Sequence, residues 1–335
     1  MSVKEKFLVV GSGSIARRHL NNLKTLFPDG VACCVSNSGR VLSVEEVGAD
    51  IIFDDLNDAI LSRPVMAIIA SPSPFHINQA EKLLAYDIPV LIEKPLTSAL
   101  SFLNDSEQLY KNKKNIDIAY NLRYLPSMQE VKRLVDSGIA GTIYNVMVDV
   151  GQYLLDWRPG ENYRDNVSAQ KSMGGGAVLE LSHELDYLLW LFGSFDSAFA
   201  RLSSSEELGL DVEDRVDAVI FGVNGLVVNL HMDFLQRRLS RTCKIIGSQA
   251  TIFWDLAKNS VELKGADTEE MIYSGTSYDR NQMYLDEVSA FYSVAKYGAE
   301  PLVGLDHSIE VMQLVEALKR SSVSNQVETI KKVIP

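Results

Sequence analysis

Cysteine is scarce in this sequence, and its few cysteines have no metal-binding spacing. Cys33, Cys34 and Cys243 are the only three among 335 residues. The first two are adjacent within an apolar run and cannot form an ordinary disulfide with each other, so we expect buried core residues. With no C-x-x-C pair and no His/Cys cluster, the sequence indicates neither a disulfide framework nor a metal site.

Long hydrophobic runs and an excess of positive charge are also missing. No apolar run approaches the roughly 20 residues that a membrane span needs, and the N-terminal MSVKEKF lacks the hydrophobic core of a signal peptide. We therefore expect a cytoplasmic protein with no membrane partner.

The chain is acidic. Its 44 Asp and Glu residues outnumber its 32 Lys and Arg residues, which gives a net charge of −12. This acidity disfavours nucleic acid and anionic lipid as main partners.

Residues 1–121 alternate short apolar strands with amphipathic helices. This alternation predicts an α/β domain with a parallel, doubly wound sheet covered by helices on both faces. The expected strands are Phe7–Val10, Val31–Val35, Ile51–Phe53, Val65–Ala70, Ile88–Glu93 and Ile116–Ala119. The expected helices are Ala16–Leu26, Leu56–Leu61, Ile77–Tyr86 and Leu100–Tyr110.

From residue 122 to residue 335 the pattern changes to strands that lie close together in the chain. After a helix over Ala177–Phe192, short apolar runs are separated by turns, and Asn224-Gly225 is a strong hairpin signal. We expect an α+β domain with an open, mainly antiparallel sheet. Further helices are expected over Ser127–Ser137, Met283–Tyr297 and Asp306–Ser321.

A glycine-rich turn joins the first strand to the first helix. It reads Gly11, Ser12, Gly13, Ser14, Ile15 and Ala16, a G-x-G-x-x-A pattern in the strand–turn–helix context of a dinucleotide site. Gly11 permits the tight turn, Gly13 lets backbone N–H groups approach a pyrophosphate, and Ala16 keeps the helix close to the strand. The helix N-terminus offers further donors to the anion. A turn without a ligand is the alternative.

The second strand ends without the acidic residue that usually binds the ribose of NAD. Ser36, Ser38 and Arg40 follow it instead, and neutral donors with a cation suit a 2′-phosphate. The segment therefore favours NADP over NAD. A solvated turn is the alternative reading.

The ends of the fourth and fifth strands carry further polar residues. Ser71, Pro72 and His76 follow the fourth, and Glu93-Lys94-Pro95 follows the fifth. Ligands of such sheets bind beyond the carboxyl ends of the strands. A lysine held between a buried strand and a proline suits proton transfer or a hydrogen bond to a substrate oxygen.

These motifs, taken in order, resemble the glucose–fructose oxidoreductase/inositol dehydrogenase (Gfo/Idh/MocA) family. G-x-G-x-x-A, S-P-x-P-x-H, E-K-P, Asn121-Leu-Arg123, and Gly174-Gly-Gly176 before His183-Glu-Leu-Asp186 span essentially the whole chain. The resemblance implies a Rossmann domain and an open-sheet domain, with nicotinamide and substrate held between them. It also implies NAD(P)-dependent oxidation of a secondary sugar or polyol hydroxyl, or the reverse reduction. We further expect a homodimer or homotetramer, with the exposed face of the C-terminal sheet as the dimer surface.

The same resemblance assigns roles to individual residues. Lys94 matches the active-site lysine and His183 the proton-transferring histidine, whose imidazole suits a base near neutral pH. The family usually carries an acid four residues before that histidine, whereas here Glu180 stands three before. Asp186 is expected to orient the imidazole or contact a substrate hydroxyl. On the cofactor side the expected residues are Asn121, Arg123, Glu93 and His76, whereas His19, His231 and His307 are treated as structural.

The loop over residues 152–173 combines aromatic side chains with two arginines. Aromatic faces pack on sugar rings and arginines bind carboxylate or phosphate, which favours an anionic or nucleotide-linked sugar, as in surface-glycan pathways. An arm that grips a neighbouring subunit is an equal alternative. The candidate substrate residues are Tyr153, Trp157, Arg158, Tyr163, Arg164, Tyr278 and Arg280.

Three functions are compatible with these motifs. The leading one is an NAD(P)-dependent sugar or polyol dehydrogenase. The family also includes glycosidases that use bound NAD for a transient oxidation. A cofactor-binding regulator without turnover is the third, motivated by the displaced acid at Glu180.

Overall fold

The computed structural model describes residues 4–36 and 42–331. Ser38 and Arg40, expected to contact the cofactor, lie outside the described residues. The chain divides into two units. The first holds the chain up to residue 121 together with residues 280–309, and the second holds residues 122–279 and the chain from residue 310 onward.

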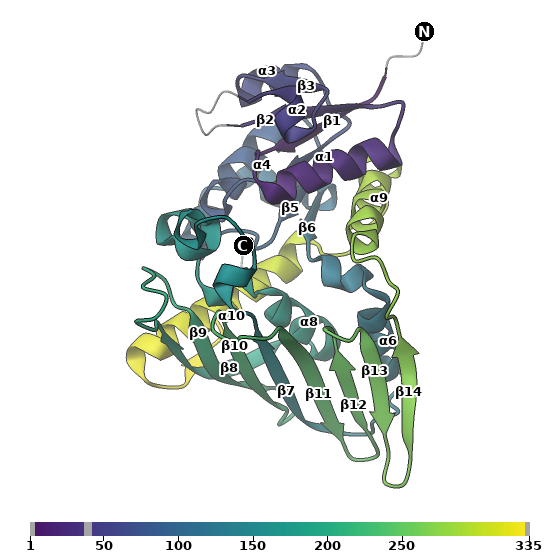
Figure 1. The fold of residues 1–335 in the computed structure, drawn as a ribbon, viewed down its shortest axis with the longest axis vertical. Helices are drawn as coiled ribbons and strands as arrows, with labels where there is room; N and C mark the ends of the chain where they lie inside the picture. Colours follow the sequence, from purple (N-terminus) through teal and green to yellow (C-terminus); the bar gives the residue numbers. More distant parts are fainter. Residues whose placement is uncertain (1–3, 37–41, 332–335) are drawn as a thin grey trace. The chain divides into compact units, whose positions relative to one another are not determined.

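The first unit contains a six-stranded parallel sheet in the order β3-β2-β1-β4-β5-β6 (Figure 1). Its central strands are almost wholly buried, as their continuous apolar sequences predict. The order reverses between β1 and β4, which is where ligands of doubly wound sheets bind. The strands are β1 (Lys6–Val10), β2 (Val31–Val35), β3 (Ile51–Phe53), β4 (Met66–Ile69), β5 (Val90–Glu93) and β6 (Ile116–Ala119).

Helices flank this sheet close to their expected positions, with one exception. The helix expected over Leu100–Tyr110 is divided into a 3-10 turn, η2 (Leu100–Leu103), and a short helix, α5 (Glu107–Lys111). Ser106 lies at the break and its hydroxyl donates to the Phe102 carbonyl, a local bond that competes with continuous helix. The other helices are α1 (Ser14–Leu26), α2 (Val44–Val47), α3 (Leu56–Leu61) and α4 (His76–Leu84).

Helix α9 (Gln282–Tyr297) belongs to the first unit, although the sequence placed residues 280–309 with the second domain. Its apolar face joins the core formed by β1, β2 and α1. The Tyr292 ring lies 4.6 Å from the Phe27 ring, between centroids, and its hydroxyl donates to Glu5. This packing is a long-range contact that no local pattern encodes.

The second unit is built on a nine-stranded sheet in the order β14-β13-β12-β11-β7-β10-β9-β8-β15. β7 and β10 pair in parallel, and the other neighbours pair antiparallel, as expected for an open, mainly antiparallel sheet. Asn224 and Gly225 turn β9 into β10, so the predicted hairpin is confirmed. The strands are β7 (Ile143–Gly151), β8 (Phe195–Ser203), β9 (Arg215–Gly222), β10 (Val227–Asp233), β11 (Ser240–Gly247), β12 (Thr251–Asp255), β13 (Ser260–Lys264), β14 (Glu269–Ser274) and β15 (Glu328–Thr329).

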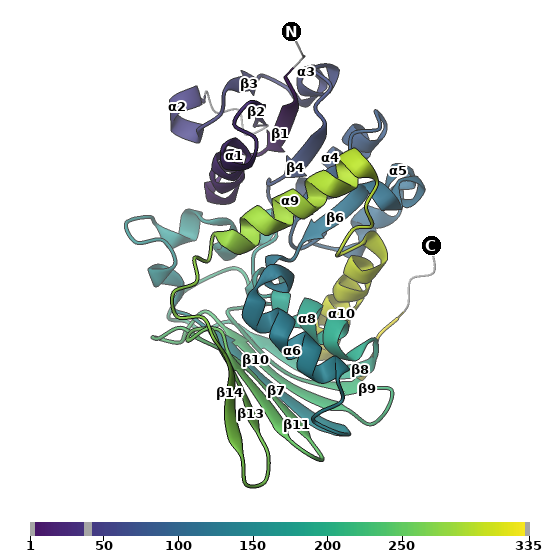
Figure 2. The same ribbon diagram turned by 90° about the vertical axis from the view of Figure 1, so that its right-hand side faces the viewer.

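Helices of the second unit cover one face of this sheet (Figure 2). They are α6 (Pro126–Asp136), α7 (Ala177–Glu180), α8 (His183–Phe192) and the later part of α10 (Leu305–Ser324). Trp254 of β12 is fully buried against them, and its indole N–H donates to Ser127 of α6. The apolar side chains of the strands therefore point toward the helices, and alternate residues form the opposite, open face.

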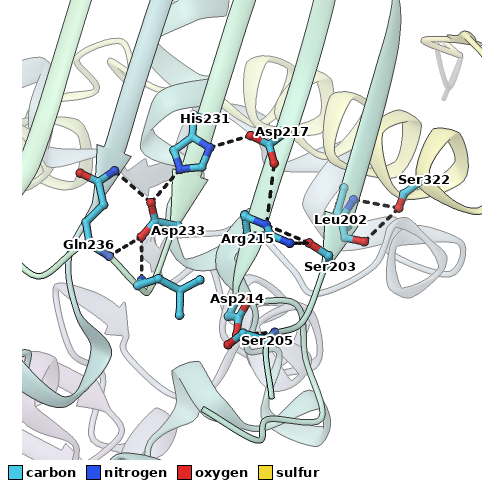
Figure 3. Close-up of polar contacts among 11 residues, drawn as sticks. Leu202, Ser203, Ser205, Asp214, Arg215, Asp217, His231, Asp233, Gln236 and Ser322 are labelled. Carbon is cyan, nitrogen blue, oxygen red and sulfur yellow. Dashed lines mark hydrogen bonds and ion pairs between the residues drawn. The ribbon is translucent and has the colours of Figure 1, made fainter. Parts of the chain in front are cut away.

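A polar network runs across that open face (Figure 3). His231 of β10 lies between two carboxylates, with Nε2 2.7 Å from Asp233 and Nδ1 2.7 Å from Asp217. Gln236 also donates to Asp233, and Arg215 donates to Ser203. The hydrogen bond to Asp233, supported by Asp217, raises the pKa of His231 to about 9. The imidazole is therefore protonated at neutral pH.

This histidine should make stability depend on alkaline pH. Its pKa is higher in the folded chain than the ordinary value near 6.5, so its contribution is complete below about pH 6.5 and is lost as pH rises through about 9. Because about a third of the side chain is exposed, we expect a discounted loss of about 1–2 kcal/mol. Urea unfolding at pH 6.5 and pH 9.5 measures it. His231→Gln should remove most of the difference, and an unchanged pH dependence in that variant would contradict the assignment.

Candidate active-site residues

The glycine-rich turn has the geometry that a bound pyrophosphate requires. Gly11 has φ +129°, and a Cβ there would lie 2.5 Å from the Ala70 carbonyl oxygen, so this position demands glycine. Among the described residues other than its chain neighbours and the backbone of its own helix, none has an atom within 4 Å of the place where a Cβ on Gly13 would stand. The first helical bond of α1 runs from Arg17 N–H to the Gly13 carbonyl at 3.0 Å, so the preceding amides have no partner within the helix. Open space beside these donors fits a dinucleotide phosphate.

The turn after β2 contacts the glycine-rich turn through two hydroxyls. The Ser12 and Ser36 Oγ atoms lie 3.2 Å apart. The amide of Gly11 also donates to the Val35 carbonyl at 2.8 Å. The two segments expected to bind the pyrophosphate and the ribose therefore form one continuous edge of the first unit.

His76 has a different environment from the one the sequence suggested. Its ring, expected to line the cofactor cleft, is 1% exposed. Nε2 lies 2.7 Å from the Ser71 carbonyl oxygen and Nδ1 lies 3.0 Å from the Pro95 carbonyl oxygen. Burial lowers the pKa of His76. The ring therefore joins the turn after β4 to the turn after β5.

Lys94 reaches solvent from a segment that is otherwise buried. Among residues 88–97 it is the one residue that is not buried. It follows β5 directly, and the Lys94–Pro95 peptide bond is cis. Its backbone N–H donates to the Glu93 carboxylate at 3.2 Å, and the other carboxylate oxygen lies 2.7 Å from Nε2 of His19.

The second unit presents its candidate residues in the same way. From residue 174 to residue 189 every residue is buried except Glu180 and His183. The helix expected over Ala177–Phe192 is interrupted between α7 and α8, and these two residues flank the interruption. Solvent access at these two positions separates them from the structural side chains around them.

The triple glycine before α7 allows close packing within the second unit. Gly176 has φ +108°, and a Cβ there would collide with the Glu213 carboxylate. Glu213 accepts the Val178 N–H at 3.1 Å, and burial raises its pKa. The sequence analysis did not select Glu213, because nothing in its local sequence indicates that it contacts α7.

Asp186 and Arg123, expected in separate roles, form a buried pair. Arg123 Nη2 and Nε donate to the two carboxylate oxygens at 2.7 and 3.1 Å. The Asp186 side chain is 0% exposed and the Arg123 side chain is 4% exposed. Glu184, the residue after His183, is also buried and pairs with Arg241 at 2.7 Å. Two arginines therefore anchor the first turns of α8, which begins at His183.

Breaking the pair should destabilise the second unit strongly. Asp186→Ala leaves the Arg123 guanidinium buried without its carboxylate, so we expect a loss of about 3–5 kcal/mol in the free energy of unfolding. The control is Asp136→Ala, which removes the partly exposed Lys132–Asp136 pair and should cost under about 1 kcal/mol. Urea unfolding of both variants gives the comparison, and equal losses would contradict a special role for the buried pair.

The candidate substrate loop makes most of its contacts within the second unit. Tyr153 donates to Glu207 at 3.1 Å, and the Arg237 guanidinium lies 3.8 Å from the centre of the Tyr153 ring. The Tyr163 hydroxyl and Arg164 both donate to the Leu208 carbonyl. Trp157 packs edge-on against Phe234, while Arg158 is partly exposed. The loop is therefore tied to residues 207–208 by aromatic and arginine side chains. Tyr278 is partly buried and Arg280 is exposed.

Two further classes of site were sought across the described parts of the chain. Within residues 4–36 and 42–331, no group of three or more His, Cys, Asp or Glu side chains is arranged to hold a metal ion. In the same ranges no helix has the length and hydropathy needed to cross a bilayer.

Sequence comparison identifies both parts of the chain. Residues 5–121 match the family described as "Oxidoreductase family, NAD-binding Rossmann fold", and residues 128–253 match the "GFO/IDH/MocA C-terminal domain". An uncharacterized oxidoreductase of Synechocystis is 32% identical over 157 residues, 45% of this chain and 41% of that protein. Inositol 2-dehydrogenase of Corynebacterium glutamicum is 27% identical over 248 residues, 70% of this chain and 68% of that protein. The first of these matches thus spans less than half of the relative.

Solved structures share the whole fold. Levoglucosan dehydrogenase in complex with NADH and L-sorbose superposes with a TM-score of 0.85 at 18% identity, covering 98% of this chain and 100% of that one. The WlbA dehydrogenase of Bordetella pertussis, in complex with NADH and UDP-GlcNAcA, gives a TM-score of 0.81 at 21% identity, with coverage of 99% and 100%. Together with the two matching domains, these findings show that the chain belongs to the Gfo/Idh/MocA family, with its NAD-binding Rossmann fold.

Proposed function

We propose that this protein is an NAD(P)-dependent oxidoreductase acting on a secondary hydroxyl or keto group of a sugar or polyol. The observation that carries the proposal is the selective exposure of three ionisable side chains. Lys94 reaches solvent from a buried segment of the first unit, and Glu180 and His183 from a buried segment of the second. Lys94 and His183 match the family's E-K-P and G-G-G…H-x-x-D motifs, with Glu180 inside the second motif, and a general base or hydrogen-bond donor must be accessible to the substrate. The match to the NAD-binding Rossmann family and the open space beside Gly13 support the binding of a nicotinamide dinucleotide.

The residues divide the chemistry between them. When bound, the nicotinamide supplies the hydride acceptor for the carbinol carbon. Lys94 donates a hydrogen bond to the carbinol oxygen and stabilises its developing negative charge. His183 accepts the hydroxyl proton as general base, and returns it in the reverse reduction. Glu180 supports the imidazole in place of the acid that the family usually carries four residues before the histidine.

For the cofactor we propose NADP, with NAD as the alternative. Ser36 lies beside the glycine-rich turn, and Ser38 and Arg40 follow it in sequence, which supplies hydroxyls and a cation for a 2′-phosphate. The solved relatives described above hold NADH. Comparing kcat/KM for the two cofactors, in the native chain and in Arg40→Ala, tests the proposal. NADP specificity should fall in the variant, and a native preference for NAD would refute it.

For the substrate we propose an anionic or nucleotide-linked sugar, used in surface-glycan synthesis. The loop over residues 152–173 supplies Trp157, Arg158 and Arg164, and the WlbA relative is in complex with UDP-GlcNAcA. Tyr278 and Arg280 are further proposed contacts. An arginine that binds a carboxylate or phosphate adds charge-assisted hydrogen bonds that a neutral sugar lacks.

The test is an assay of purified protein with NADP or NAD. Panels of free sugars, inositols, sugar acids and UDP-linked sugars are added, and formation of reduced nicotinamide is followed by absorbance. Net reduction with one substrate class supports the proposal. Cleavage of an aryl glycoside without net redox change would instead identify an NAD-dependent glycosidase. Cofactor binding with no turnover of any panel member would identify a regulator.

We further propose that the open face of the nine-stranded sheet joins two copies of this chain. Strand register places Phe199, Met147 and Met271 in one row across that face, and each is more than 40% exposed. Light scattering should report a dimer or tetramer, and Met147→Arg should lower its mass. A monomeric native protein would refute this.

We also propose a cytoplasmic location. The three buried free cysteines agree with a reducing compartment, and cell fractionation tests the location.

A further inference from the structure

The backbone at Lys94 has little support from the sheet that precedes it. The pairing of β4 with β5 ends at Ile92, and the pairing of β5 with β6 ends at Glu93. Lys94 is therefore the first residue beyond the ladder on both sides. Its N–H donates to the Glu93 side chain instead. We therefore expect the placement of the Lys94 backbone to depend in part on what holds the Glu93 carboxylate and the residues that follow.

His19 of α1 holds the Glu93 carboxylate from one side. Its side chain is fully buried, and Nε2 lies 2.7 Å from Glu93 Oε1. Within the described residues, Nδ1 of His19 has no hydrogen-bond partner. A proton on Nδ1 would be buried without an acceptor, whereas a proton on Nε2 faces a carboxylate oxygen. His19 then donates to Oε1 while Oε2 accepts the Lys94 N–H, so both carboxylate oxygens are engaged.

His76 of α4 holds the same turn from the other side. One ring nitrogen faces the Pro95 carbonyl at 3.0 Å and the other faces the Ser71 carbonyl at 2.7 Å. Ser71 is itself tied to α4, because its hydroxyl donates to Gln79 at 2.7 Å. The residue before Lys94 is thus held by the buried imidazole of His19. The residue after it lies against that of His76, which when neutral donates to one of its two carbonyl neighbours.

We propose that His19 and His76 are positioning residues that fix Lys94 in its catalytic place. The inference rests on the proposed role of Lys94. Neither imidazole reaches solvent, so neither contacts substrate, and both act through the backbone next to the lysine. His19 also lies on the helix whose N-terminus forms the proposed pyrophosphate site, so it connects the two functional segments of the first unit. A misplacement of about 1 Å at a catalytic group can cost about a hundredfold in rate.

A double-mutant cycle on the full-length protein tests the proposal for His19. We expect His19→Ala to lower kcat about 10–100-fold with KM changed less than about threefold. In a Lys94→Ala background the same substitution should cost less than about twofold, because the lysine it positions is gone. His19→Gln, whose amide nitrogen replaces the Nε2 donor, should recover kcat to within about fivefold. His307→Ala, a histidine on α10, serves as the matched control and should leave kcat unchanged.

The outcomes separate this inference from the proposed function. If Lys94→Ala leaves kcat unchanged, the proposed function of Lys94 fails. If Lys94→Ala lowers kcat but His19→Ala costs the same factor in both backgrounds, the positioning role alone is overturned. Thermal melting checks that each variant folds, and His19→Phe, which keeps a ring but has no Nε2 donor, replaces the alanine variant in the cycle if alanine prevents folding. The same cycle with His76→Gln tests the second imidazole, and additive losses there would limit the positioning role to His19.

Discussion

Replacing Lys94 by alanine should lower kcat about a thousandfold and leave cofactor binding nearly unchanged. A donor aimed at an oxygen that gains negative charge in the transition state typically contributes a factor of about 10²–10³. The side chain is partly exposed in an otherwise buried segment, so we expect its removal to change the free energy of unfolding less than the loss of a buried side chain would. The loss should therefore appear in the rate and not in the free energy of unfolding. Steady-state rates and titration of reduced cofactor fluorescence measure the two quantities.

The control for this prediction is a lysine of the same unit with no proposed role. Lys114 is 84% exposed and pairs at 3.5 Å with Glu300, so Lys114→Ala should leave kcat within about twofold. Lys94→Arg keeps the charge but changes the shape of the donor, and we expect partial activity from it. A Lys94→Ala enzyme with native kcat would remove this residue from the mechanism.

Local sequence patterns predicted the first unit well because its signals are local. Continuous apolar strands, the glycine-rich turn and the helical periodicities each lie within about 15 residues. The six-stranded parallel sheet followed from them. The sequence predictions were wrong where a long-range contact decided the structure, or where a side-chain hydrogen bond competed with the helical backbone. Helix α9 packs on β1 and α1 through residues nearly 300 positions away, and the hydroxyl of Ser106 interrupts a helix that periodicity alone would continue.

For the candidate site too, local motifs predicted some residues and missed the long-range contacts. The motifs selected Lys94, His183 and Glu180, and the structure shows each of them emerging from buried surroundings. The supporting contacts were not predictable, because they join positions far apart in sequence. Arg123 meets Asp186 across 63 positions, and His19 meets Glu93 across 74. His19 was treated as structural because no sequence pattern relates a histidine on α1 to a carboxylate at the end of β5.

The two arginines that bind α8 explain how His183 can be partly exposed and still fixed in position. Glu184 and Asp186 are completely buried, and each bonds an arginine from another element of the second unit. The beginning of the helix is therefore held in place next to its partly exposed first residue, His183. A general base gains most from such support, because proton transfer requires a hydrogen-bond distance to the substrate hydroxyl.

Replacing His183 by alanine should therefore lower kcat about 10²–10⁴-fold, the usual contribution of a positioned general base. The loss should be largest near neutral pH. At higher pH hydroxide assists removal of the substrate proton, so the acid limb of the native pH–rate profile should disappear in the variant. Because His183 reaches solvent, added imidazole should restore part of the activity in a concentration-dependent way.

His183 and Glu180 can be separated by comparing their variants. Glu180→Gln keeps the size of the side chain and removes its charge, so a supporting acid predicts a smaller loss than in His183→Ala, with no rescue by imidazole. His231→Gln is the matched histidine control, since this residue lies in the polar network of the open sheet face and should keep native kcat. A His183→Ala enzyme that retains the acid limb and ignores imidazole would assign the base to another residue. A loss in Glu180→Gln larger than in His183→Ala would transfer that role to the carboxylate.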